Sequence, residues 1–374
     1  MDTQVTTDTE KTALYAAHVR KLRDLSLSGR RVLLPDGLWI SITGNCNFKC
    51  VGCWREGLFT KTYVSVAQVK NMLVGSRDRQ YGYISFTWGE AFLHPDLCDI
   101  IEMCREMHPE AKIDLMSNGS IPPKGRFAKA VSMIDDLGLS IDGATKATYE
   151  AIRVGGNFEK FLENTRAIVA IRAATGQPRD LTFSFTANTQ NIAELPDLVT
   201  LAAELGVPYV YAQPMEMVHP EIVARVGAYH LGLMPTDAIY RITDAALARG
   251  KALGVHVDLA GFLVRPVGGD ADIEPSADER DRDVRQCQYP YQKPFLLVPS
   301  ADKYRVLLCC YMVEDAGDIA AERYGLEFDA PPEAVAVYNS PAFWRFRTDL
   351  ADGKVADLCG RCMQARTYPW QGHS

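Results

Sequence analysis

The chain has 374 residues, with 40 Lys and Arg against 47 Asp and Glu, and a formal net charge of −7. Its 47% hydrophobic and 23% charged residues are typical of globular proteins and exclude the disordered and fibrous classes. The acidic balance gives no sign of a general nucleic-acid-binding surface, and no apolar run approaches the roughly 20 residues of a membrane span. The N-terminus lacks the apolar core of a signal peptide. We therefore expect a cytoplasmic protein, without nucleic-acid or membrane partners, of two domains or of one large barrel with an appendage.

Short apolar segments alternate with helical ones along the first two thirds of the chain. Their Val, Ile, Leu and aromatic content predicts strands that are buried on both faces, at 38–43, 83–87, 112–116, 136–141, 181–187 and 208–213. Helices are predicted between them, among them 97–107 with Asp96 as its N-cap, and 158–173 with one apolar stripe. Six β–α units in series indicate an α/β fold with a parallel sheet, open or curled into a barrel.

The organisation changes after a further helix at 236–250 and a strand at 256–259. Residues 270–283 are strongly acidic with almost nothing apolar, which predicts a solvated linker or loop. A hairpin is predicted from 294–299 and 304–310, followed by a polar tail. We expect an N-terminal helical extension at 1–35, a barrel domain at 36–255 and a small C-terminal α+β domain at 256–374.

Ten cysteines are many for a chain of this kind. In a reducing compartment, clustered thiols indicate a metal site or catalysis rather than disulfides. Cys46, Cys50 and Cys53 follow the first strand directly with the spacing Cys-x3-Cys-x2-Cys, at the strand end where α/β sheets carry their chemistry. Three thiolates suit zinc or an iron–sulfur cluster, but no histidine stands at zinc-finger spacing as a fourth ligand. A [4Fe–4S] cluster held by three thiolates keeps one iron open for chemistry, and a structural zinc loop is the alternative.

Three further strand ends carry motifs. The second predicted strand is followed by Trp88-Gly89-Glu90, the third by Ser117-Asn118-Gly119, and the fourth by Ser140-Ile141-Asp142-Gly143, with Arg153 on the next helix. Together with the cysteine loop, these motifs resemble the radical S-adenosylmethionine (radical SAM) superfamily from about residue 36 to residue 215. The family has Gly-Gly-Glu at the second position, so Trp88 replaces the first glycine.

The resemblance implies a partial (β/α)6 TIM-like barrel in which S-adenosylmethionine binds the open iron of a [4Fe–4S] cluster. Backbone groups around Trp88-Gly89-Glu90 are expected to receive its ammonium, since glycine lets backbone approach closely. Ser140 and Arg153 are expected to meet its carboxylate. The family often has an aromatic residue where this chain has Gly52, so the adenine is expected against one of the flanking rings. The cofactor-binding residues implied in this way are Phe48, Trp54, Trp88, Gly89, Glu90, Asn118, Ser140 and Arg153.

The C-terminal cysteines are similar to those of the twitch domain, the shortened SPASM domain that binds one auxiliary [4Fe–4S] cluster. The resemblance implies four ligands, Cys287, Cys309, Cys359 and Cys362. Cys309 and its neighbour Cys310 point to opposite faces of a strand, so only one is expected to bind, and spacing from the hairpin turn favours Cys309. Cys310 is then a buried small residue or a hydrogen-atom donor, and structural zinc is again the alternative.

Two cysteines are assigned to packing. Cys98 and Cys104 lie six residues apart on the predicted helix 97–107, so their side chains point about 120° apart and do not suit one site.

The substrate pocket is expected over the carboxyl ends of the fifth and sixth strands, with Thr186, Asn188, Tyr211, Gln213 and Glu216 as candidates. The resemblance implies an oxidoreductase of antibiotic biosynthesis, which abstracts hydrogen from an aminocyclitol or sugar and oxidises it through the auxiliary cluster, with flavodoxin or ferredoxin as electron donor. Epimerisation or another modification of a ribosomal peptide is the second hypothesis. Only about 35 residues precede the first strand, so no separate leader-binding domain is expected. A non-catalytic iron–sulfur or zinc scaffold is the third hypothesis.

Overall fold

The structure is a computed structural model. It describes residues 37–53, 62–74, 81–215, 224–259, 262, 295–297, 304–307, 327–329 and 332–352.

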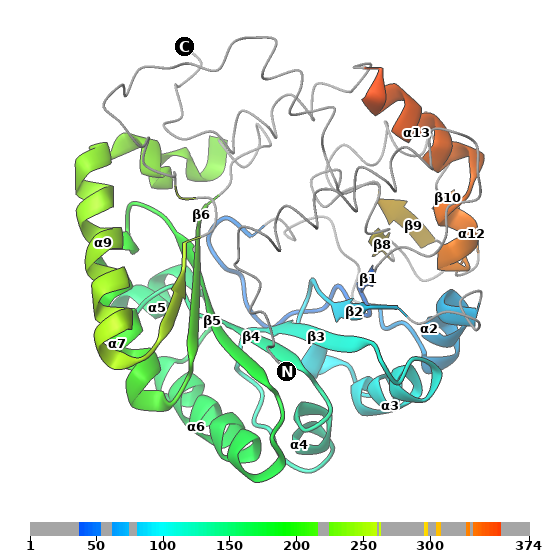
Figure 1. The fold of residues 1–374 in the computed structure, drawn as a ribbon, viewed down its shortest axis with the longest axis horizontal. Coiled ribbons are helices and arrows are strands. Elements are labelled where there is room, and N and C mark those ends of the chain that lie inside the picture. Colours follow the sequence, from blue (N-terminus) through cyan, green and yellow to red (C-terminus); the bar gives the residue numbers. More distant parts are fainter. Residues whose placement is uncertain are drawn as a thin grey trace, which may run out of the picture.

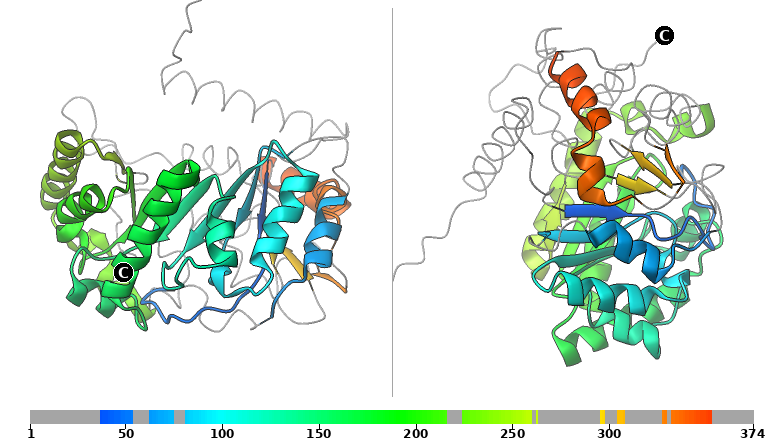
Figure 2. Two further views of the ribbon diagram at one scale, coloured as in Figure 1. Left: turned by 90° about the horizontal axis from the view of Figure 1, so that it is seen from below. Right: turned by 90° about the vertical axis from the view of Figure 1, so that its right-hand side faces the viewer.

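Seven parallel strands form the main part of one sheet, and each lies beside its predecessor in the chain. They are β1 Gly37–Ile40, β2 Tyr83–Phe86, β3 Lys112–Ser117, β4 Asp136–Ser140, β5 Asp180–Ala187, β6 Tyr209–Pro214 and β7 His256–Asp258. The sheet curves into an open barrel with the helices on its outer side (Figure 1). Figure 2 shows these helices as a layer along the sheet. The alternating pattern predicts the parallel α/β sheet, open or curled, and the partial barrel that the resemblance implies is the form found.

The outer helices follow the strands in turn. They are α2 Val66–Leu73, α3 Leu97–Met107, α4 Arg126–Val131, α5 Lys146–Ile152, α6 Phe158–Thr175, α7 Leu195–Leu205 and α9 Thr236–Leu253. Short 3-10 turns lie at Ala91–Leu93, Ile192–Glu194, Gly227–Tyr229 and Leu231–Leu233. No helix in the described ranges is long and apolar enough to cross a membrane.

The predicted bounds agree closely with these elements, and two local differences have physical causes. β1 ends at Ile40 rather than at residue 43, because the chain leaves the sheet and Thr43 pairs in an isolated bridge with Tyr63. Helix α3 has the predicted bounds with Asp96 at its N-cap, but the expected cap is wrong: the Asp96 side chain makes no capping hydrogen bond. Instead, the backbone N–H of Asp96 donates to Nδ1 of His94, over 3.0 Å.

The predicted hairpin is present and continues the same sheet. β8 Phe295–Leu297 pairs antiparallel with β9 Tyr304–Leu307, and β10 Glu327–Phe328 follows on β9. β8 also pairs in parallel with β1, so the hairpin extends the barrel sheet beyond β1. Two helices, α12 Ala334–Tyr338 and α13 Pro341–Ala351, follow in the chain. The division into three domains stays a prediction.

The core lies between the sheet and the helix layer. Cys98 and Cys104 are both part of it, with exposed fractions of 3% and 0%. Their burial agrees with the packing role expected from their spacing.

Candidate active site

The cysteine loop is held from both sides. On one side, the Thr43 hydroxyl donates to the carbonyl of Thr62 over 2.9 Å. On the other, the N–H groups of Lys49 and Val51 donate to the carbonyls of Val154 and Ile152, at the end of α5. The loop is thereby a fixed bridge between β1 and α5, and it places its thiols above the carboxyl ends of the strands.

All three thiols of this loop are free and half-buried. Burial raises the pKa of Cys50 to about 11, with Arg153 acting in the opposite direction and Cys53, Asp142 and Cys46 adding to the rise. The three sulfurs therefore share one electrostatic environment. A thiol with this pKa is protonated at neutral pH, so binding of a metal must displace the proton.

The donor set of this loop is three thiols, Cys46, Cys50 and Cys53. Thiolates are the ligands that iron–sulfur clusters prefer, so these residues fit such a cluster.

The turn after β2 docks on this loop through Gly89. The residue has φ +65°, and a Cβ there would lie 2.3 Å from the carbonyl oxygen of Thr43 and 2.8 Å from that of Asn45. Only glycine fits such a close approach of two backbones. Trp88 has φ +67°, a conformation that costs a non-glycine residue about 1–3 kcal/mol. A glycine would adopt this conformation freely, so Trp88 carries a conformational cost that a glycine would not.

Glu90 links the ends of β2 and β3 with a fully buried carboxylate. Its oxygens accept hydrogen bonds from the Ser117 hydroxyl (2.9 Å), the N–H of Asn118 (2.6 Å) and the N–H of Phe92 (3.1 Å). Burial raises the pKa of Glu90 above its ordinary value, although these donors oppose the rise. The side chain thus organises the two strand ends, while its own N–H donates to the carbonyl of Asn45 in the cysteine loop.

Asn118 and Arg153 both reach the ligand sulfurs. Nδ2 of Asn118 lies 3.7 Å from Sγ of Cys46, and Nη1 of Arg153 lies 3.9 Å from Sγ of Cys50. Arg153 also forms an ion pair with Asp142, whose other oxygen accepts the N–H of Thr186 over 2.8 Å. Burial alone would lower the pKa of Arg153, but Asp142 and Cys50 raise it, so the guanidinium stays charged.

Asp142 has no role predicted from the sequence. The residue stands within the strand-four motif, and its position one residue before a glycine at a strand end was the available signal. Its function as the partner of Arg153 depends on a contact across 11 positions, which spacing alone does not show.

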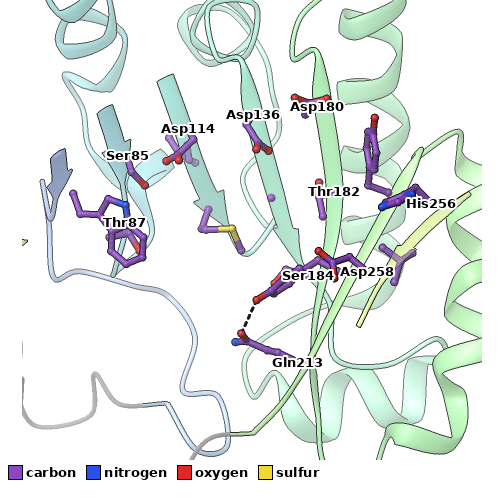
Figure 3. Close-up of a pocket in the computed structure, with 17 residues that line it drawn as sticks. Ser85, Thr87, Asp114, Asp136, Asp180, Thr182, Ser184, Gln213, His256 and Asp258 are labelled. Atoms are coloured by element: carbon purple, nitrogen blue, oxygen red, sulfur yellow. Dashed lines mark hydrogen bonds between the residues drawn. The ribbon is translucent and has the colours of Figure 1, made fainter. Parts of the chain in front are cut away.

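A cavity of about 710 Å³ lies inside the barrel, lined from all seven parallel strands (Figure 3). Ser85, Asp114, Asp136 and Asp180 occupy matching register positions on four neighbouring strands. Asp258 on β7 adds a fourth carboxylate, and no Lys or Arg is found among the described lining residues. This cavity, the barrel chamber, is therefore acidic.

Charge repulsion within this row is visible at Asp136. Burial raises its pKa to about 6, and the neighbouring Asp180 adds to the rise while Lys112 opposes it. The carboxyl group therefore changes its charge within the physiological range.

The comparison with family models decides the identity of this arrangement. The model described as the Radical SAM superfamily matches residues 40–210, which contain the cysteine loop and all the strand-end motifs. Residues 40–210 are therefore a radical SAM domain. This family uses a [4Fe–4S] cluster and S-adenosylmethionine.

Individual relatives are more distant. The chain is 25% identical over 353 residues to the mycofactocin maturase MftC of Mycobacterium ulcerans, covering 82% of this chain and 90% of the relative. It is 28% identical over 142 residues to a GTP 3′,8-cyclase of Limosilactobacillus fermentum, and this match spans only 43% of the cyclase. Among solved structures, SuiB of Streptococcus suis bound to S-adenosylmethionine has a similar fold, with a TM-score of 0.63 at 13% identity over 92% of this chain and 75% of SuiB.

The remaining expected site residues occupy varied positions in this radical SAM barrel. Phe48 is buried, and its ring lies against Gly156. Ser140 ends β4 opposite Ser184. The expected residues Trp54, Glu216, Cys287, Cys309, Cys310, Cys359 and Cys362 lie outside the described residues.

Of the expected substrate residues, two line the chamber. Tyr211 and Gln213 do so, and the Tyr211 hydroxyl donates to Oε1 of Gln213 over 3.0 Å. Asn188 is fully buried, and its side chain bonds backbone groups of its own turn. The N–H of Thr186 holds Asp142, as described above. The row of acidic residues Asp114, Asp136 and Asp180 was not predicted. Which face of each strand points inward depends on the register between strands, and the sequence alone does not specify that register.

Proposed function

We propose that this radical SAM protein is an oxidoreductase that abstracts hydrogen from a substrate held in the barrel chamber. The observation that carries the proposal is the convergence on one loop of three half-buried thiols, the Gly89 turn and the side chains of Asn118 and Arg153. A [4Fe–4S] cluster held by Cys46, Cys50 and Cys53 would supply the electron that cleaves S-adenosylmethionine and so generates a 5′-deoxyadenosyl radical.

The residues around the loop bind and orient the cosubstrate in this proposal. Backbone groups of Trp88 and Gly89 receive its ammonium, because the left-handed turn brings backbone close to the loop. Ser140 and Arg153 meet its carboxylate. A guanidinium carries five N–H donors, and the contacts to Asp142 and Cys50 use only part of them.

The chamber favours a small polar substrate with an amine. Its volume of about 710 Å³ lies within the range of small-molecule sites. Asp136 and Asp180 begin their strands, at the end away from the cysteine loop. Asp258 is in register with Ser140 through β5 and β6, so its carboxylate is the one placed to attract a cation toward the carboxyl ends. An aminocyclitol or aminosugar combines such an amine with hydroxyl-bearing carbons. Dehydrogenation of one of these carbons removes a hydrogen atom, an electron and a proton. Cys287, Cys309, Cys359 and Cys362 would hold an auxiliary [4Fe–4S] cluster that would accept the electron, while the hydrogen atom would go to the 5′-deoxyadenosyl radical and the proton to solvent. Flavodoxin or ferredoxin is the proposed electron donor to the first cluster.

Modification of a ribosomal peptide is the second candidate. It is favoured by the similarity to the mycofactocin maturase, which spans 82% of this chain and 90% of that protein. Epimerisation is one such reaction, and it needs a hydrogen-atom donor, for which Cys310 is the proposed thiol.

Isotope transfer tests both candidates. The reconstituted protein is incubated with reductant, S-adenosylmethionine and either deuterated aminocyclitols or deuterated peptides, and 5′-deoxyadenosine is analysed by mass spectrometry, with Cys46→Ala as the control. Deuterium from an aminocyclitol supports the first candidate, and deuterium from a peptide supports the second. In deuterated water, solvent deuterium fixed at carbon indicates epimerisation rather than net oxidation. Zinc in place of iron, with no 5′-deoxyadenosine formed, would support a non-catalytic scaffold and contradict both candidates.

A further inference from the structure

Side-chain hydrogen-bond donors from elsewhere in the barrel reach two of the three thiols in the cysteine loop. Sγ of Cys46 lies 3.4 Å from the N–H nitrogen of Phe48 and 3.7 Å from Nδ2 of Asn118. Sγ of Cys50 lies 3.9 Å from Nη1 of Arg153. Within the described ranges, no side-chain donor is found at the sulfur of Cys53. The three ligand positions are therefore supported unequally.

The amide of Asn118 is fixed in the orientation that faces the sulfur. Its Oδ1 accepts the N–H of Ser120 over 2.9 Å, which leaves Nδ2 as the group directed to Cys46 and to Oδ1 of Asn47, the latter at 2.9 Å. Its backbone N–H donates to the buried carboxylate of Glu90. The position of Nδ2 is thus set by contacts within its own turn, to the cysteine loop and to the turn after β2, and not by the sulfur alone.

Arg153 is fixed in the same way from the other side of the loop. Its Nε lies 2.7 Å from Oδ2 of Asp142, and the N–H of Thr186 holds the second oxygen of that carboxylate. The guanidinium is largely buried, so its charge acts on the sulfur in a medium of low dielectric constant.

Hydrogen bonds to ligand sulfurs change the electronic properties of an iron–sulfur cluster. An N–H group that donates to a thiolate stabilises its negative charge, and this favours the reduced state of the cluster, which carries one more electron. We propose that Asn118 and Arg153 raise the reduction potential of the cluster held by Cys46, Cys50 and Cys53, by donating to two of its three ligand sulfurs. Both are positioning residues in this role, distinct from the contacts to cosubstrate expected of them. The proposal rests on the proposed function, since it requires a cluster at this loop.

Redox titration without S-adenosylmethionine tests the proposal directly. The full-length protein with reconstituted clusters is reduced stepwise with dithionite, and the signal of the first cluster is followed by electron paramagnetic resonance. Asn118→Leu and Arg153→Met are each expected to lower the equilibrium constant for reduction of the cluster about tenfold. For a one-electron couple this lowers the midpoint potential by about 59 mV. Arg153→Lys keeps a charged donor and is expected to recover part of the loss.

Arg225→Gln is the matched control. Nη2 of Arg225 donates to the backbone carbonyl of Cys53 over 2.9 Å, and the side chain is exposed to solvent. The substitution removes a positive charge that lies beside the cysteine loop and donates to its backbone rather than to a sulfur. The midpoint potential is therefore expected to stay unchanged. An equal shift in this variant would overturn the proposal in favour of a general charge effect.

The outcomes separate this inference from the proposed function. If the wild-type protein binds no iron at the first site, the proposed function fails and the inference fails with it. If the variants retain the cluster and its potential does not move, only the inference fails. If a variant loses its iron, pulsed electron paramagnetic resonance on the reduced wild-type protein containing isotope-labelled arginine decides: coupling to a guanidinium nitrogen supports the contact to Cys50, and its absence contradicts it.

Discussion

Arg153 and Asp142 form a buried ion pair, with Nε 2.7 Å from Oδ2 and exposed side-chain fractions of 14% and 6%. The pair connects α5 to the end of β4, and it determines where the guanidinium lies relative to the cysteine loop. Buried pairs of this kind are sensitive to the loss of one partner, because the remaining charge is then uncompensated.

Asp142→Ala is expected to lower the free energy of unfolding by about 3–5 kcal/mol, the cost of a buried unpaired charge. Urea denaturation under anaerobic conditions measures it. Asp99→Ala is the control, since the ion pair of Asp99 with Arg126 is exposed and screened by water, and no measurable change is expected there. Equal losses in the two variants would contradict a special role for the buried pair.

The three thiols of the cysteine loop are expected to be individually essential. Alanine at Cys46, Cys50 or Cys53 removes one ligand, so iron at the first site and formation of 5′-deoxyadenosine should both be lost. Iron analysis and chromatography of the reaction mixture measure these two quantities. Cys98→Ala, which changes a core cysteine of α3, should keep both, and loss of iron there would contradict the assignment. Cys359→Ala should spare cleavage but stop product formation.

Gly89 should not tolerate even a methyl group. Gly89→Ala adds a Cβ that collides with the Thr43 carbonyl at 2.3 Å, in addition to the cost of positive φ. Gly176→Ala has a similar φ, +75°, but meets nothing within 4 Å, so it is expected to cost only the conformational penalty of about 1–2 kcal/mol. The difference in melting temperature between the two variants measures the close contact of the turn with the cysteine loop. A similar decrease in both would show that the loop moves to accept the methyl group.

The raised pKa of Asp136 predicts a pH-dependent gain in stability on its removal. The folded value is about 6 against 3.8 for the ordinary carboxyl group, so the stabilising proton is bound at low pH and is lost as pH rises through about 6. Asp136→Asn should therefore melt at a higher temperature than the wild type above about pH 6, and at the same temperature below about pH 4. Thermal denaturation across this range tests it.

The adjacent carboxylate provides a control of opposite sign. Burial would raise the pKa of Asp135, but Arg105, the N–H of Ile113 and Arg179 outweigh it and hold the pKa below its ordinary value. The stability that Asp135 contributes is present above the ordinary pKa and is lost as pH falls through the lowered value. Asp135→Asn should therefore destabilise the fold at neutral pH. If Asp135→Asn and Asp136→Asn both raised or both lowered the melting temperature at neutral pH, the environments assigned to the two carboxyl groups would be contradicted.

The sequence by itself determined the local elements and the family. The six predicted parallel strands and the bounds of α3 are present. The expectation that both faces of each strand are buried is wrong: buried and half-buried residues alternate along β5, because Asp180, Thr182 and Ser184 line the cavity. The cysteine spacing and the strand-end motifs are contiguous in the chain, and for that reason they identified the radical SAM barrel before any contact was known.

Only the tertiary structure decided which side chains meet. The Arg153–Asp142 pair, the contacts of Asn118 and Arg153 to sulfur and the acidic row of Asp114, Asp136 and Asp180 all join residues from different strands or helices. The pairing of β8 with β1 likewise joins distant segments. Such relationships depend on register and on the closeness of backbones, which the order of residues does not specify. The net charge of the chain does not show that Asp114, Asp136, Asp180 and Asp258 line one cavity, because only the fold brings them together.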